Sequence, residues 1–383
     1  MHNASVDPEA SSKVIEANSE NRQNKNIEAF DFLRAIFSII VVAIHADFFI
    51  LGEILVSSTL TILLRANVGY IAVPIFCQIS LFLFSLKSEK TGKKYLLKKR
   101  LPKLLSLYCF WVISLIVLEV FLKGDNSAIN WKQLSLQELV QIIVSGGKSP
   151  FYFFFSLIFI ILLTEPLIAL FRRLENPRTR ITISYSFLFI SCALVFLFSF
   201  NPLIISSFNI TKEITFFRVI YNLGEWHYNP LNFLPYIFTT AITVQEFKAG
   251  KLKKLTSAIK LKLYVLLALF LMFTVLEWSL LEKLVHYARL SIVFGSWLLI
   301  YLALLSTRKP PTTIKFLSAC SLGIYGFHPF FTHILYPLNT NFLLTLDQIM
   351  PGLDTLVKFL VAIIGSIVLT LIFRRIKGLK NFV

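Results

Sequence analysis

The chain has 383 residues, of which 56% are hydrophobic and only 15% are charged. A soluble globular protein has about a quarter of its residues charged, so this composition excludes an ordinary soluble fold. The net charge of +17 does not indicate a nucleic-acid partner, because the cations cluster between long apolar runs, as in membrane proteins.

Residues 1–28 are polar, mixed in charge and poor in aromatic side chains. Such a segment cannot bury enough apolar surface to fold, so we expect a disordered cytoplasmic tail. The first apolar run follows this tail, lacks a small-residue cleavage site and contains Arg and His, and is therefore not a signal peptide. We expect one transmembrane domain over 29–375 and a short basic cytoplasmic tail at 376–383.

Ten apolar runs approach or exceed the length of about 20 residues that a helix needs to cross a bilayer. They are continuous, unlike the short alternating strands of a membrane β-barrel. The predicted fold class is therefore all-α, a polytopic membrane bundle of about ten transmembrane helices. The predicted spans are 29–51, 68–86, 101–122, 150–171, 181–200, 230–247, 261–279, 287–306, 314–338 and 355–373.

The connectors between these spans alternate in charge. Lys and Arg are frequent after spans two, four, six, eight and ten, and sparse elsewhere. With ten helices, every cation-rich connector falls on one side of the membrane. The positive-inside rule makes that side cytoplasmic, so both termini are expected in the cytoplasm.

The first span contains Arg34 and His45, two ionisable residues at membrane depth. They are eleven positions apart, which places them on nearly the same helix face, about 16 Å apart along the axis. Hydrocarbon does not solvate such groups, so each needs a partner, a hydrated cavity or a ligand. Asp31, one turn earlier, is close enough to pair with Arg34, whereas Asp47 is poorly placed to orient His45. The alternative is that Arg34 snorkels to headgroups and His45 bonds a neighbouring helix.

Two further stretches lie towards the cytoplasmic side. At the entrance of the third span, Arg100 and Lys103 are one turn apart, an arrangement that suits a phosphorylated ligand. Tyr108 and Trp111 follow in the same span. Glu165, near the cytoplasmic end of the fourth span, could pair with Arg172 or Arg173.

The ninth span contains Ser321, Tyr325 and His328, whose offsets of four and three form one polar stripe. Pro329 removes a backbone hydrogen bond and predicts a kink. The stripe could serve catalysis or simply hydrogen-bond neighbouring helices. His333, five residues after His328, is expected to face elsewhere.

The sequence contains no P-loop, GxSxG, HExxH or GxGxxG motif in a suitable context. The four cysteines lie within or beside apolar runs and form no CxxC, which indicates neither a disulfide framework nor a metal site. We therefore expect no metal and no bound cofactor.

Together these stretches resemble acyltransferase family 3. The resemblance rests on Arg34-x10-His45, on the basic stretch before Tyr108 and Trp111, on the aromatic block 151–155 followed by Glu165-Pro166, and on Ser321…Tyr325…His328, and it covers about 30–375. The sequence departs from the family pattern at four positions. Lys103 replaces an Arg, Leu107 a Pro, and Phe151 and Phe153 a His and a Trp.

The resemblance implies a multi-pass enzyme of the bacterial cytoplasmic membrane that acylates a hydroxyl of a glycan or lipid-linked saccharide. The co-substrate would be acyl-CoA, expected to be acetyl-CoA, whose charged phosphates must stay at the cytoplasmic mouth of the bundle. His45 is the expected general base with Arg34 as the second catalytic residue, although an acylated His45 is equally compatible with the sequence. The remaining expected roles are donor binding by Arg34, Arg100 and Lys103, and acceptor binding or support by Tyr108, Trp111, Glu165, Ser321, Tyr325 and His328.

Two other functions could account for parts of this pattern. A transporter or flippase would also explain buried polar groups, but it predicts internal repeats with paired broken helices. We find no convincing repeat between the halves of the chain. A non-catalytic membrane partner would not need the polar stripe on the first span.

Overall fold

The computed structural model describes residues 28–55, 57–123, 140, 150–207, 215–226, 228–281, 284, 286–335 and 340–383. The tail expected at 1–28 lies outside this part of the chain, except for its last residue. The described part is 86% helical and contains no strand, so the all-α prediction is confirmed.

Each of the ten predicted spans overlaps one of ten helices, although the first and ninth spans were predicted to extend six and nine residues past the ends of their helices. These helices are α2 (Phe30–His45), α5 (Ala72–Thr91), α7 (Leu101–Lys123), α9 (Tyr152–Arg173), α10 (Pro177–Ser207), α12 (Leu234–Lys248), α13 (Ser257–Leu280), α14 (Leu290–Leu305), α15 (Thr312–Pro329) and α17 (Leu353–Arg375).

Shorter elements connect or extend these helices. They are α3 (Ile50–Leu55), α4 (Ser58–Leu64), α6 (Lys93–Tyr95), α11 (Thr215–Glu225) and α16 (Thr340–Ile349), the π-helical turns η1 (Arg65–Gly69), η2 (Leu96–Arg100) and η6 (Phe330–Leu335), and the 3₁₀ turns η4 (Pro230–Phe233), η5 (Lys251–Lys253) and η8 (Lys380–Phe382).

Six helical stretches in the described residues are long and apolar enough to cross a membrane. They are Ser58–Thr91, Lys93–Leu122, Tyr152–Arg173, Pro177–Ile205, Ser257–Leu280 and Leu353–Arg375. The other predicted spans correspond to α2, α12, α14 and α15, which have 16, 15, 16 and 18 residues. This helical pattern is that of a multi-pass membrane protein.

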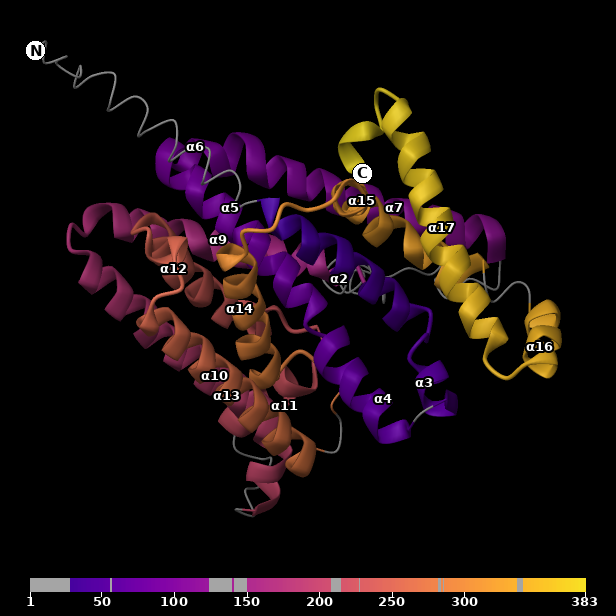
Figure 1. Ribbon diagram of the computed structural model, residues 1–383, viewed down its shortest axis with the longest axis horizontal. Helices are drawn as coiled ribbons and strands as arrows, with labels where there is room; N and C mark the ends of the chain where they lie inside the picture. Colours follow the sequence, from indigo (N-terminus) through magenta and orange to yellow (C-terminus); the bar gives the residue numbers. More distant parts are fainter. Residues whose placement is uncertain are drawn as a thin grey trace, which may run out of the picture.

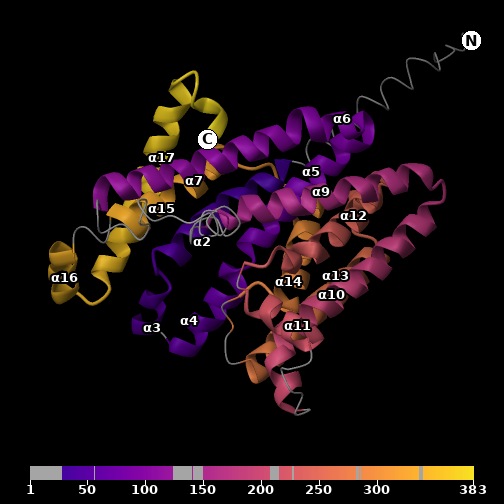
Figure 2. The same cartoon turned by 180° about the vertical axis from the view of Figure 1, so that it is seen from behind.

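The helices pack around a rod made of α4, η1 and α5, which runs from the lower right to the upper left of Figure 1. Most of this rod is buried inside the protein, whereas α13 and α17 are largely exposed and lie at the periphery. Helix α2 packs mainly against α15 and also touches α5, α14 and α17. Helices α3, α4 and α11 lie towards the lower end of both views, and α6 and the C-terminus towards the upper end (Figures 1 and 2).

A buried ion pair fixes η1 against α13 and α14. The Arg289 and Glu277 side chains are 1% and 0% exposed and lie 2.8 Å apart. Arg289 also donates to the Ala66 carbonyl oxygen at 2.9 Å and to Asn67 Oδ1 at 2.7 Å, and both of these residues belong to η1. Arg289 also donates to the Leu284 carbonyl oxygen and to Ser291 Oγ, so each of its guanidinium N–H groups has an acceptor. A buried guanidinium with every N–H paired is a structural anchor.

Candidate functional site

Arg34 lies near the start of α2. Its Nη1 is 3.5 Å from Asp31 Oδ1, so the predicted Arg34–Asp31 pair is confirmed. Asp31 also accepts a hydrogen bond of 2.6 Å from Ser318 Oγ of α15. The pair is partly buried, with side-chain exposures of 28% and 23%, and it joins the first and ninth predicted spans.

Of the other two predicted donor-binding cations, only Arg100 reaches the interior. Arg100 ends the π-helical turn η2, donates to Ser80 Oγ of α5, and lies within electrostatic range of Arg34. The Lys103 side chain is exposed on α7. The structure therefore brings Arg34 and Arg100 together and leaves Lys103 on the outer surface of the bundle.

His45, at the end of α2, lines a small internal cavity of about 40 Å³, which we call the His45 cavity. The polar groups around it come mainly from five tyrosines, Tyr70, Tyr152, Tyr228, Tyr287 and Tyr325. A volume of this size holds about three water molecules.

Hydrogen bonds and ring stacking fix this aromatic wall. The Tyr152 hydroxyl donates to the Tyr287 hydroxyl at 2.5 Å, and the rings of Tyr152 and Tyr228 stack with centroids 4.0 Å apart. The Tyr325 hydroxyl donates to the Pro150 carbonyl oxygen. Of these tyrosines, only Tyr325 was predicted from the sequence. The others lie at helix ends or in connectors, where no spacing distinguishes a site residue from a packing residue.

Three histidine rings meet beside this cavity. The His45 centroid lies 5.0 Å from that of His328 and 5.6 Å from that of His333. His328 is fully buried, and its Nδ1 lies 3.2 Å from the Ile324 carbonyl oxygen. With Nδ1–H donated to that carbonyl, Nε2 is left as an acceptor. Within the described residues this buried Nε2 has no hydrogen-bond partner.

The expectation that His333 faces elsewhere is wrong, because its ring lies edge-on against His45. The α-helix that was expected to kink at Pro329 instead ends there and continues as the π-helical turn η6. Hydrogen bonds from i to i+5 put more residues in each turn of a π-helix than in an α-helix, so residues five apart lie closer in angle than in an α-helix. His333 is five residues after His328, and the turn brings its ring nearer to the side of the helix that contacts His45.

Three charged residues flank His45 at the same end of α2. Asp47 has a left-handed backbone, with φ of 57°, and its carboxylate pairs with Lys358 Nζ at 3.0 Å and with Arg65 Nη2 at 4.0 Å. Both cations lie within electrostatic range of His45. Sequence reasoning missed them as site residues. Lys358 could have been identified from the sequence, since it is an ionisable residue inside the tenth predicted span.

Four other predicted residues do not line the His45 cavity, namely Tyr108, Trp111, Glu165 and Ser321. The buried Trp111 ring packs edge-on against Phe327, with centroids 4.8 Å apart, and Tyr108 and Ser321 are buried nearby in α7 and α15. Glu165 pairs with Arg172 at 2.7 Å, one of the two partners expected, and accepts a hydrogen bond from Ser88. It is thirteen residues from Tyr152 along α9, about 20 Å from the His45 cavity, and so does not line it.

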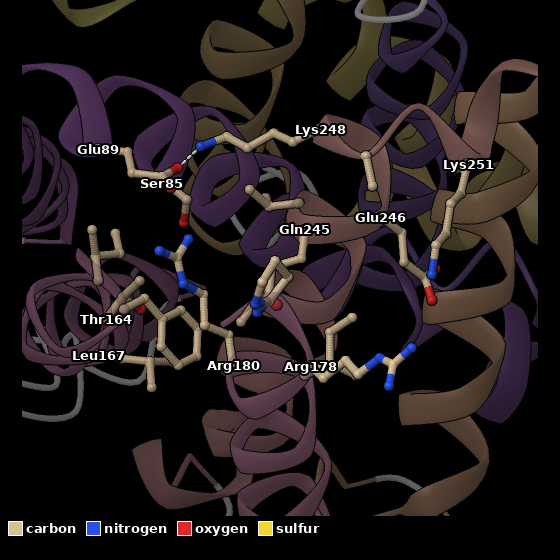
Figure 3. Close-up of a pocket in the computed structure, with 17 residues that line it drawn as sticks. Ser85, Glu89, Thr164, Leu167, Arg178, Arg180, Gln245, Glu246, Lys248 and Lys251 are labelled. Atoms are coloured by element: carbon tan, nitrogen blue, oxygen red, sulfur yellow. Dashed lines mark ion pairs between the residues drawn. The ribbon is translucent and has the colours of Figure 1, made fainter. Parts of the chain in front are cut away.

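A second and larger cavity, of about 410 Å³, lies between α5, α9, α10 and α12 (Figure 3). Its walls are largely apolar, and its polar rim includes Arg178, Arg180, Lys251 and the ion pair between Lys248 and Glu89. From the sequence alone, these cations were explained by membrane topology. Their arrangement around an apolar space suits an anionic amphiphile, but the cavity contains none of the predicted site residues.

No group of three or more His, Cys, Asp or Glu side chains in the described part of the chain is arranged to hold a metal ion.

Comparison with known proteins identifies the family. A family model described as an acyltransferase domain, that of acyltransferase family 3, matches residues 27–375, nearly the whole chain. No curated protein and no solved structure matches the chain significantly. The matched range includes Arg34, Arg100 and the entire His45 cavity. This chain is a helical membrane protein that belongs to acyltransferase family 3.

Proposed function

We propose that the protein transfers an acyl group, expected to be acetyl, from acyl-CoA to a hydroxyl of a glycan or lipid-linked saccharide. The observation that carries the proposal is the position of His45, an imidazole that lines a small cavity together with five tyrosines, within a chain of an acyltransferase family. The acyl acceptor oxygen, the use of coenzyme A and the role of His45 are all parts of this proposal.

The proposal includes a topology. Ten membrane crossings would put both termini in the cytoplasm of a bacterial cell, with 29–375 as the transmembrane domain between cytoplasmic segments 1–28 and 376–383. Ten helices at the predicted positions and the alternation of cation-rich connectors support this arrangement.

In the proposed reaction, the acceptor hydroxyl gives its proton to His45 as its oxygen attacks the thioester carbonyl carbon. The C–S bond then breaks, and the departing thiolate of coenzyme A takes the proton from His45. The products are the acyl ester of the acceptor and the free thiol. General-base assistance of this kind contributes about 10²–10⁴-fold to the rate.

The neighbouring groups have complementary roles in this scheme. A tyrosine hydroxyl of the His45 cavity would stabilise the negative charge that develops on the carbonyl oxygen. His328, whose ring lies against His45, would hold the base in position. Arg34 and Arg100, near the opposite end of α2, would bind the phosphates of the donor, and the thin pantetheine arm would span the distance between them and His45.

The experiment is transfer of radiolabelled acetyl from acetyl-CoA by the full-length protein in proteoliposomes that contain the surface glycans of the host cell. Mass spectrometry of those glycans identifies the acylated position. Label on a glycan hydroxyl supports the proposal, whereas movement of the glycan across the bilayer without acylation would favour the transporter alternative.

A further inference from the structure

The charged residues next to His45 form what we call the Asp47 cluster, which consists of Asp47, Arg65 and Lys358. They come from the turn after α2, from the first position of η1 and from the second turn of α17. The Lys358 side chain is only 12% exposed, and those of Arg65 and Asp47 are 35% and 41% exposed. Three segments that are far apart in the sequence thus place charged side chains next to one another.

Membrane topology does not explain these cations. The connectors that are rich in Lys and Arg begin at the other ends of α5, α9 and α12, where the positive-inside rule accounts for them. Arg65 and Lys358 instead lie beside the end of α2 that contains His45. Arg65 and Lys358 must therefore have a local structural or functional role at this end of the bundle.

The need to stabilise the Asp47 turn explains only part of the cluster. A non-glycine residue with positive φ is disfavoured, and the 3.0 Å contact with Lys358 stabilises Asp47 in that conformation. Arg65 contributes little to this purpose, because its guanidinium is 4.0 Å from the carboxylate. Its Nε is buried and has no hydrogen-bond partner among the described residues. The Nε–H of Arg65 is therefore not used within the cluster and is available to a second anion.

The charge balance of the cluster matters for chemistry at His45. Two cations and one carboxylate leave one excess positive charge within electrostatic range of the ring. When His45 takes a proton from the acceptor, the imidazolium that forms is repelled by this excess charge. An acceptor that brings its own negative charge next to Arg65 cancels the excess and removes the repulsion.

We propose that the Asp47 cluster, through Arg65, binds an anionic group of the acceptor, a carboxylate or phosphate next to the hydroxyl that is acylated. This inference rests on the proposed function and narrows its acceptor to acidic glycans. Arg65 and Gly69 belong to the same π-helical turn, and Gly69 lines the His45 cavity. The anion site and the reaction site thus share one short segment, which Arg289 holds in place through Ala66 and Asn67.

The test compares two sugars that differ at one carbon, galacturonate and galactose, by isothermal titration calorimetry on the full-length protein in nanodiscs. We expect the wild type to bind galacturonate about tenfold or more tightly than galactose, because a guanidinium–carboxylate contact adds charge-assisted hydrogen bonds. Arg65→Gln should abolish this preference without changing the affinity for galactose. Arg65→Lys, which keeps the charge but loses the planar fork, should retain part of it.

Arg375→Gln is the matched control, since this arginine is exposed at the far end of α17 and should leave both affinities unchanged. Equal binding of the two sugars by the wild type, or a preference that survives in Arg65→Gln, would overturn the inference. Acetyl transfer is measured separately on the same samples. A preference for galacturonate with no transfer to any glycan would instead count against the proposed function.

Discussion

The imidazole rings of His45 and His328 lie with their centroids 5.0 Å apart, one at the end of α2 and the other in the last turn of α15. The two helices form the most extensive helix–helix contact in the described part of the chain. Nδ1 of His328 is hydrogen-bonded to a backbone carbonyl of its own helix, whereas His45 lines the cavity. Within the proposed function, this asymmetry favours His45 as the base and His328 as the positioning residue.

His45→Ala should lower acyl transfer by about 10²–10⁴-fold, because it removes the proposed general base. The measurement is incorporation of labelled acetyl into glycan at matched protein levels. His2→Ala, which precedes the range matched by the family model, is the control and should be fully active. Near-normal activity of His45→Ala would remove this residue from the mechanism.

His328→Asn should lower kcat while leaving the KM for acyl-CoA unchanged, because in the proposed mechanism this residue orients His45 and does not contact the donor. The pH profile of kcat should also change, since the environment of the base is altered. Steady-state kinetics over a range of pH tests both effects. An increase in KM with an unchanged kcat would place His328 in substrate binding instead.

Arg34→Gln and Arg100→Gln should each weaken acyl-CoA binding by about tenfold or more, since a hydrogen bond to a charged group contributes about 1.5–3 kcal/mol. Equilibrium binding of acetyl-CoA to protein in nanodiscs gives the affinities. Lys103→Gln is the informative comparison, because Lys103 was predicted to bind the donor but its side chain is exposed. Equal losses in all three variants would mean that the donor binds farther towards the surface of the bundle.

Arg289→Met should destabilise the protein by about 3–5 kcal/mol, because it leaves the Glu277 carboxylate buried without its ion-pair partner. Thermal unfolding in detergent measures the loss. The double variant Arg289→Met with Glu277→Leu should recover much of it, since both charges are then removed. A double variant no more stable than Arg289→Met would show that the anchoring of η1 matters more than the unpaired charge.

Gly326→Ala should displace Trp111, because an added Cβ would overlap the indole ring. Overpacking of this kind typically costs about 1–3 kcal/mol. Tryptophan fluorescence and thermal unfolding should both change. Gly378→Ala is the matched control, since nothing lies within 4 Å of the position of its Cβ.

Much of the fold could be predicted from the sequence, because apolar runs of membrane length leave the backbone no option but helix. The Arg34–Asp31 pair could also be predicted, since it depends only on spacing within one helix. The position of His333 could not be predicted, because the π-helical turn η6 changes the angle between successive residues. Contacts between distant helices, such as that of Asp47 with Lys358, depend on packing that no periodicity reveals.

The small volume of the His45 cavity has a consequence for the donor. The tyrosine rings that close it are fixed by the Tyr152–Tyr287 hydrogen bond and by stacking on Tyr228, so the cavity cannot widen without breaking these contacts. An acetyl group is short enough to sit there, but every added methylene would need space that the aromatic wall occupies. If the acyl group is bound in this cavity, as the proposed function requires, the wall would favour acetyl over long fatty acyl thioesters.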